Sequence, residues 1–143
     1  MNKLSFLSVI AVLGGLVSKA FGGWSSALTT LIVFMTIDYI TGLILAGIFK
    51  KSKKTENGSL ESRVGWKGLC RKGVTLLIVL VAVRLDMAVG TTFVKDAVIT
   101  AFSANEALSI IENSALMGVP IPKPLTNAIE VLKSKADDNN ENA

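Results

Sequence analysis

The sequence predicts an all-α integral membrane protein with three to four transmembrane helices and a short C-terminal amphipathic helix. Half of the 143 residues are hydrophobic and only 18% are charged, and the mean hydropathy of +0.54 is high for a soluble domain. The apolar residues also come in long blocks, at 4–17, 24–49 and 74–94. A soluble chain of this length could not bury so much apolar surface around one core, so we expect hydrocarbon to cover much of it.

Residues 1–118 are expected to form the transmembrane domain and residues 119–143 a cytoplasmic segment. Each predicted span is long enough, at about 1.5 Å of rise per residue, to cross a hydrocarbon core of roughly 30 Å. The predicted spans cover residues 4–21, 27–49, 73–94 and 97–118.

The first of these segments has an alternative interpretation. A basic start, an apolar run and then small residues are also typical of a secretory signal peptide, with Ser18-Lys19-Ala20 as the cleavage site. Lys19 is unfavourable in such a site and another apolar run follows at once, so an uncleaved span is favoured. A helix lying at the membrane interface is the other alternative.

The second segment, Ala27 to Phe49, is the clearest span, because its only charged residue is Asp38. From Lys50 to Lys72 the chain is polar and strongly basic, with a turn at Asn57-Gly58. No aromatic residues are interleaved as a nucleic-acid site would require, so we expect no nucleic-acid partner. A basic stretch between two apolar spans indicates a cytoplasmic loop.

The basic residues of this loop are expected to set the topology and to contact anionic lipid headgroups. Both chain termini are then cytoplasmic if the first segment spans. The residues concerned are Lys50, Lys51, Lys53, Lys54, Arg71 and Lys72.

The last part of the chain is expected to return to the cytoplasmic side. Lys95-Asp96 predicts a very short outer turn between the third and fourth spans. After Gly118, a proline-rich stretch cannot continue the helix. Apolar residues at helical spacing within 125–132 predict a short amphipathic helix on the inner membrane face, and residues 137–143 are polar enough to be disordered.

Five ionisable residues fall inside the predicted spans, where each costs roughly 2.5–3.5 kcal/mol at the bilayer centre. They must therefore pair, lose their charge or contact water. Counting from the predicted cytoplasmic helix ends places Asp38, Arg84 and Glu106 in one layer near the midplane, with Asp86 half a turn further out. This predicts that Arg84 bridges Asp38 or Glu106. The alternative is that these residues, with Glu112, only fix the register of a monomeric bundle.

The fourth span carries a second polar signal. Ala97, Ala101, Asn105, Ser109 and Asn113 recur every four residues, beside the two glutamates. Such a ridge can pack helices closely and hydrogen-bond across them. In one bundle it would be an interface, and in a ring of subunits it could line water. The candidates for pore lining or assembly are Asp38, Arg84, Asp86, Asn105, Glu106, Ser109, Glu112 and Asn113.

The composition argues against an enzyme. The chain has no histidine and one cysteine, Cys70, which excludes an internal disulfide, a zinc site and Cys/His catalysis. No nucleophile–base pair, metal-ligand set or phosphate-binding loop is present. We therefore expect no catalytic, cofactor or metal site.

With these residues in view, the chain resembles the toxin-secretion/phage-lysis holin family, whose members come from phages of Gram-positive bacteria and from clostridia. The similarity covers roughly residues 24–135, and the ordered combination of motifs is more specific than any one of them. The motifs are Asp-Tyr-Ile-Thr-Gly at Asp38–Gly42, Gly68-x-x-Arg71-Lys72, Leu85-Asp86, Glu-Ala-Leu-Ser-Ile-Ile-Glu-Asn at Glu106–Asn113, and Gly118-Val-Pro-Ile-Pro122. Arg84 lies outside this pattern.

The resemblance implies a small protein of the bacterial cytoplasmic membrane that forms homo-oligomers and then opens lesions. Its partners would be copies of itself, membrane lipids and an antiholin. An endolysin or a toxin would pass as cargo without direct binding. By the same analogy Asp38, Asp86, Glu106 and Glu112 would control assembly or pore formation. The alternatives are an antiholin or other regulatory membrane protein, and a small ion-conducting channel.

Overall fold

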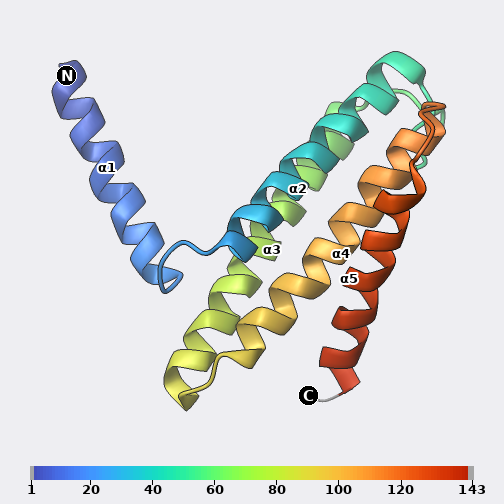
Figure 1. Ribbon diagram of the computed structural model, residues 1–143. Coiled ribbons are helices and arrows are strands. Elements are labelled where there is room, and N and C mark those ends of the chain that lie inside the picture. The colour runs from blue at the N-terminus through green and yellow to red at the C-terminus, as the bar shows by residue number, and fades with distance from the viewer. Residues whose placement is uncertain (1, 142–143) are drawn as a thin grey trace.

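The computed structural model describes residues 2–141, and over these residues the protein is entirely helical (Figure 1). This confirms the all-α class. The elements are α1 (Lys3–Ala20), α2 (Ser26–Ile44), a π-helical continuation η1 (Leu45–Phe49), α3 (Ser62–Val89), α4 (Phe93–Leu116) and α5 (Lys123–Glu141).

Two helical segments of the described chain are long and apolar enough to cross a membrane: α1, and the 24-residue helix formed by α2 and η1. This is fewer than the three to four predicted. The helices α3 and α4 have 28 and 24 residues, so length is not what separates them from α1 and α2. Their polar and ionisable side chains lower their apolar character.

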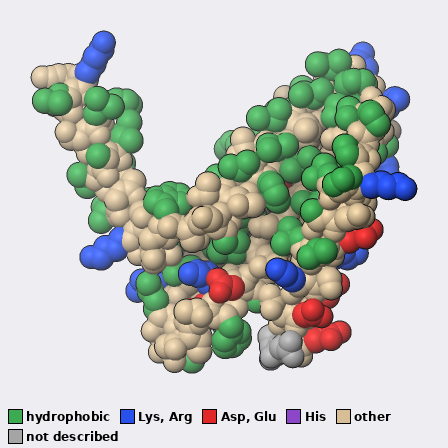
Figure 2. Space-filling view, viewed as in Figure 1, with side chains coloured by type: hydrophobic (Ala, Val, Ile, Leu, Met, Phe, Trp, Pro, Cys, Tyr) green, Lys and Arg blue, Asp and Glu red, His purple; other side chains and the backbone are tan. Residues whose placement is uncertain are grey.

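The helices α2 to α5 form a bundle in which α4 lies between α2 and α5 (Figure 1). The chain direction makes α2 and α4 parallel to each other, and α3 and α5 antiparallel to them. Helix α1 extends away from the bundle and buries none of its residues. Figure 2 shows hydrophobic side chains along α1 and over much of the bundle face that it draws.

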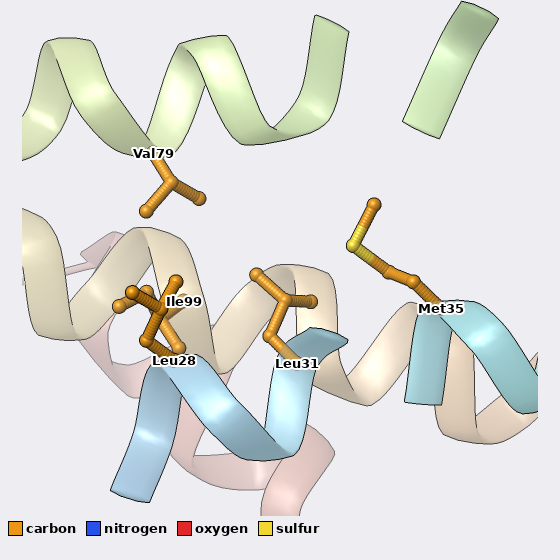
Figure 3. Close-up of a cluster of buried hydrophobic side chains, with 5 residues drawn as sticks. All are labelled: Leu28, Leu31, Met35, Val79 and Ile99. Atoms are coloured by element: carbon orange, nitrogen blue, oxygen red, sulfur yellow. The ribbon is translucent and has the colours of Figure 1, made fainter. Parts of the chain in front are cut away.

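The core of the bundle joins α2, α3 and α4. Leu28, Leu31 and Met35 of α2 pack against Val79 of α3 and Ile99 of α4 (Figure 3). Leu31 and Val79 have no exposed surface. Burying each such side chain contributes about 1.5–3 kcal/mol, so this cluster fixes the register of the three helices that build the site described below.

The predicted boundaries of the third and fourth helices were wrong. Helix α3 begins at Ser62, so the connecting loop is only residues 50–61, and Lys95-Asp96 lies in the first turn of α4. The turn between α3 and α4 is at residues 90–92, where Gly90 adopts φ 80°. Three glycines among the basic residues 62–73 are typical of a loop, but tertiary packing makes this stretch helical.

That packing centres on Tyr39 of α2. Its hydroxyl donates a hydrogen bond of 3.2 Å to the carbonyl oxygen of Gly65. Gly65 and Gly68 face the Tyr39 side chain at van der Waals distance: a Cβ added at these positions would lie 3.7 Å and 3.9 Å from it. The first turns of α3 are therefore held onto α2.

The C-terminal segment is also more helical than predicted. Helix α5 has 19 residues, longer than the short helix expected around 125–132, and it includes residues 137–141, which were expected to be disordered. The last two residues of that expected tail lie outside the described part of the chain. Helix α5 packs along α4 rather than standing alone, and this contact accounts for its greater length.

Gly58, in loop 50–61, has a backbone conformation that favours glycine. It has φ 75°, and a Cβ at this position would lie 2.2 Å from the carbonyl oxygen of Lys50. The left-handed conformation alone costs a non-glycine residue about 1–2 kcal/mol, so Gly58→Ala is expected to open the loop and speed its cleavage by trypsin. Gly73→Ala is the matched control, because the helical site is open and alanine should stabilise the helix by about 0.5–1 kcal/mol. Equal cleavage rates in both variants would contradict this prediction.

Candidate functional site

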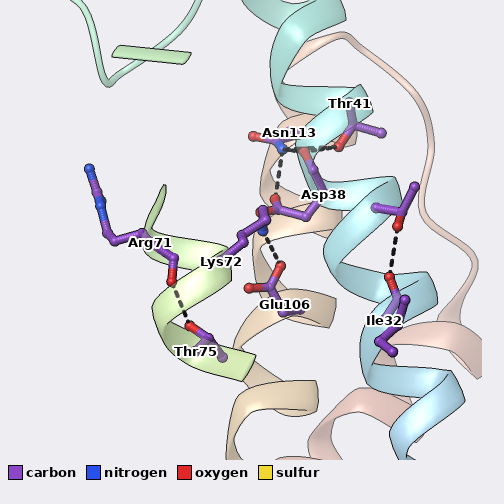
Figure 4. A network of polar contacts seen from close by, with 9 residues as sticks. Ile32, Asp38, Thr41, Arg71, Lys72, Thr75, Glu106 and Asn113 are labelled. Carbon is purple, nitrogen blue, oxygen red and sulfur yellow. Dashed lines mark hydrogen bonds and ion pairs between the residues drawn. The ribbon is translucent and has the colours of Figure 1, made fainter. Parts of the chain in front are cut away.

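A buried network of polar side chains joins α2, α3 and α4, and we call it the polar cluster (Figure 4). The Lys72 Nζ lies 2.7 Å from Asp38 Oδ2 and 2.6 Å from Glu106 Oε2. The Asn113 amide donates to Asp38 Oδ1 at 3.2 Å and to Thr41 Oγ1 at 3.0 Å. One lysine from α3 thus bridges a carboxylate from each of the other two helices.

The polar cluster is largely removed from solvent. The side chains of Asp38, Lys72 and Glu106 are 7%, 15% and 15% exposed, and Asn113 is buried. One ammonium group faces two carboxylates, so the three side chains carry a formal charge of −1 when all are ionised. Hydrogen bonds from Asn113 compensate part of that excess. Such a network holds helices together only while each member keeps its partners.

A cavity of about 320 Å³ adjoins the polar cluster and extends toward loop 50–61. Its walls include Lys72, Glu106 and Ser109, and the loop contributes Lys53 and Lys54. This volume and its polar walls suit several water molecules. The cluster therefore lies at the inner end of a polar space rather than in a dry core.

The predicted bridge by Arg84 was wrong. Arg84 is exposed, and its Nη1 lies 3.3 Å from the sulfur of Met87, while Lys72 takes the bridging position. The wrong residue was predicted because the depth of Arg84 in the membrane depends on where the cytoplasmic end of its helix lies. That end was predicted at Lys72, whereas α3 begins at Ser62. Moving that end by ten residues, about 15 Å of helix, brings Lys72 rather than Arg84 level with Asp38.

Asp86 lies elsewhere, at the turn between α3 and α4. Its Oδ1 accepts from the Thr91 hydroxyl at 2.6 Å and from the Val94 amide at 3.2 Å, and its Oδ2 accepts from the Lys95 amide at 2.7 Å. It thus satisfies amide groups at the start of α4 that have no partner within the helix. The geometry gives Asp86 the role of a helix cap.

Replacing Asp86 by alanine is expected to destabilise the bundle by about 1–3 kcal/mol, because the amides of α4 and the Thr91 hydroxyl lose a charged acceptor. Unfolding of the purified protein in detergent micelles measures this. Asp96→Ala is the control, since Asp96 is exposed in the first turn of α4 and should contribute only about 0.3–1 kcal/mol through the helix dipole. A larger loss for Asp96 than for Asp86 would refute the capping role.

The polar residues predicted on α4 all line the same cavity but differ in exposure. Asn113 is buried and Ser109 half-buried, whereas Asn105 and Glu112 are exposed. Residues spaced by four rotate about 40° per step around a helix, so Asn105 lies about 80° from Asn113. The structure brings Glu106 and Asn113 to the cluster and places Asn105, Ser109 and Glu112 in the wall of the adjoining cavity.

The basic residues also separate into two groups. Lys72, expected at the lipid headgroups, points into the bundle instead (Figure 4). The others are exposed, and Figure 2 shows Lys and Arg side chains at the end of the molecule where loop 50–61 lies. The exposed residues are Lys50, Lys51, Lys53, Lys54 and Arg71.

Lys72 as the bridge, and Thr41 and Tyr39 as contact residues, were not predicted from the sequence. In the structure, half-buried or buried residues recur every three or four positions along α3, at 64, 68, 72, 75, 79, 82 and 86. These positions hold Val, Gly, Lys, Thr, Val, Ala and Asp, so no apolar period marks this helix face in the sequence. Within residues 2–141 no group of His, Cys, Asp and Glu side chains could hold a metal ion.

Comparisons with known proteins identify the family of the chain. The family model for the bacteriophage holin family matches residues 15–134. A "Probable holin" of Bacillus phage phi105 is 37% identical over 115 residues, covering 80% of this chain and 79% of that protein. An "Uncharacterized 14.9 kDa protein in nagH 3′ region" of Clostridium perfringens is 38% identical over 128 residues, covering 88% and 91%.

A further relative is an uncharacterised protein of Listeria innocua, 35% identical over 140 residues, which cover 97% of this chain and 91% of the relative. No solved structure matches the chain. The family match spans the whole polar cluster and most of the described helices, and it confirms the resemblance drawn from the motifs. This membrane protein therefore belongs to the bacteriophage holin family.

Proposed function

We propose that the protein acts as a holin of the bacterial cytoplasmic membrane, where copies accumulate, oligomerise and open lesions that release an endolysin or a toxin. The observation that carries the mechanism is the polar cluster, in which Lys72 connects Asp38 and Glu106 across three helices. Family membership and the phage relative support the holin role.

In the proposed topology α2, α3 and α4 cross the membrane, and α1 is a further span. Loop 50–61 carries Lys50, Lys51, Lys53 and Lys54, which favours the cytoplasmic side and contact with anionic headgroups.

Before lesions open, the polar cluster satisfies the ionisable groups within each subunit and the membrane stays sealed. In an assembled ring, water replaces these contacts, and Glu106, Ser109, Glu112 and Asn113 face the opening. Because the cavity already offers polar space beside Glu106 and Ser109, this exchange needs a limited rearrangement. Falling membrane potential or rising density of copies shifts the population toward the ring.

The proposed partners follow from this mechanism. Copies of the chain supply the remaining walls of the lesion, and lipids cover the outer apolar faces. An antiholin that binds the closed form would delay opening. Endolysin or toxin passes through the lesion without binding to it.

The test is inducible expression of the chain alone, with membrane potential and release of a cytoplasmic reporter enzyme followed together. Glu106→Gln and Glu112→Gln are compared with Glu56→Gln, an exposed residue of loop 50–61. We expect loss of potential and reporter release together, with release shifted in time in the first two variants and unchanged in the third. Loss of potential without reporter release would favour an ion channel, and no lysis at all would favour an antiholin.

A further inference from the structure

Helix α5 lies lengthwise against α4, on the side of α4 that faces away from α3 (Figure 1). It buries Ile129 and Ala136, while Ala104 and Ala107 are buried on α4. The two helices are antiparallel, and the 19 residues of α5 match the 19 residues of α4 from 98 to 116 in length. In this form α5 thus runs beside almost the whole of α4.

The composition of α5 is incompatible with that position inside a membrane. The apolar side chains that it buries are one isoleucine and one alanine. Placing a single ionisable residue at the bilayer centre already costs about as much as burying an isoleucine gains. Helix α5 has seven ionisable residues, all of them on exposed positions: Lys123, Glu130, Lys133, Lys135, Asp137, Asp138 and Glu141.

We infer that α5 is a detachable cover of α4. Helix α5 packs along α4 in the bundle described above, and it moves to the cytoplasmic membrane surface when α4 crosses the bilayer. This inference rests on the proposed function, because it requires α4 to span. While α5 stays in place, its charged side chains keep α4 out of the hydrocarbon. Release of α5 is therefore the step that admits α4.

The sequence around α5 fits both positions. Leu125, Ile129, Leu132 and Ala136 recur at helical spacing along one face, the pattern of a helix that lies in the membrane interface with its polar side in water. The connection from α4 contains Gly118, with φ 84°, and two prolines. Since neither proline can extend α4, α5 can change direction without unwinding α4.

The test measures one distance in the full-length chain. Cys70 is the only cysteine, so a Cys70→Ser background accepts nitroxide labels at Asp96→Cys and Glu141→Cys, both exposed. With α5 packed on α4, helix axes about 8–10 Å apart place the labels on the order of 10–20 Å from each other. With α5 on the membrane surface, the helix lengths separate them by roughly 40 Å.

In vesicles of phosphatidylethanolamine and phosphatidylglycerol, pulsed electron–electron double resonance is expected to show the longer distance. The control pair Thr29→Cys with Asp96→Cys, on the parallel helices α2 and α4, should keep its short distance. A distribution confined to 10–20 Å for the α4–α5 pair would overturn the detachable cover.

Two parallel readouts separate this result from the proposed function. A membrane-impermeant maleimide applied outside cells labels Asp96→Cys only if α4 crosses, and reporter release shows whether lesions open. The longer distance without reporter release would support the inference that α5 detaches and would refute the holin mechanism. A short distance, together with labelling from outside and reporter release, would refute the detachment of α5 and support the holin function.

Discussion

Replacing Lys72 by methionine is expected to destabilise the bundle by about 3–5 kcal/mol, because it leaves two largely buried carboxylates without their shared cation. Unfolding of the purified protein in detergent micelles measures the loss. Lys67→Met is the matched control: Lys67 is exposed on the same helix, and its replacement should change the free energy of unfolding by less than about 0.5 kcal/mol.

The cause of the loss is tested by removing the charges together. Adding Asp38→Asn and Glu106→Gln to Lys72→Met should restore much of the stability, since a buried ion network can often be replaced without net cost whereas a single missing partner cannot. If the triple variant is less stable than Lys72→Met alone, uncompensated charge is not the reason for the loss.

Asp38→Leu is expected to cost about 2–4 kcal/mol, more than Glu106→Leu. Asp38 accepts from both Lys72 and Asn113, and its loss leaves the buried Asn113 amide with fewer acceptors. Glu106 pairs with Lys72 and lies beside Asp38, and its removal leaves one lysine paired with one aspartate. Unfolding of the two variants under identical conditions compares them. A larger loss for Glu106→Leu would place the centre of the network on α4 rather than α2.

The second helix could be predicted closely from the sequence. An apolar run with a single charge predicts residues 27–49, and the structure has one continuous helix from Ser26 to Phe49. Hydrophobicity and length are sufficient to predict this helix. The start of α3 could not be predicted in the same way, because three glycines between 62 and 73 disfavour a helix locally and contacts distant in sequence, such as those of Gly65 with Tyr39 and of Lys72 with Asp38, favour it.

The members of the polar cluster were largely predictable, but their pairing was not. A buried carboxylate needs a partner, which predicted one layer holding Asp38, Glu106 and a cation that bridges one of them. The identity of the bridging cation depends on where α3 begins. Because the predicted start lay about three helical turns too far along the chain, Arg84 was predicted at the position that Lys72 occupies. Asn105 and Glu112 were grouped with Asn113 because they share a polar arc, yet neighbouring helices cover only one side of that arc.

The motif at residues 38–42 acquires a physical meaning in the structure. Asp38 binds Lys72, Tyr39 binds the backbone of Gly65, and Thr41 accepts from Asn113. Gly42 faces the same partner: a Cβ at this position would lie 3.8 Å from the Asn113 amide nitrogen. The motif encodes the surface on which α3 and α4 meet α2.

In the proposed mechanism, the Lys72 bridge holds the bundle closed and thereby sets when lesions open. The most direct test of this mechanism is the time from induction to release of a cytoplasmic enzyme in cells that express the wild-type chain, Lys72→Met or Lys67→Met at equal levels. We predict release by the wild type, earlier release by Lys72→Met, and unchanged timing for Lys67→Met. No release by the wild type, or identical timing in all three at equal accumulation, would contradict the account.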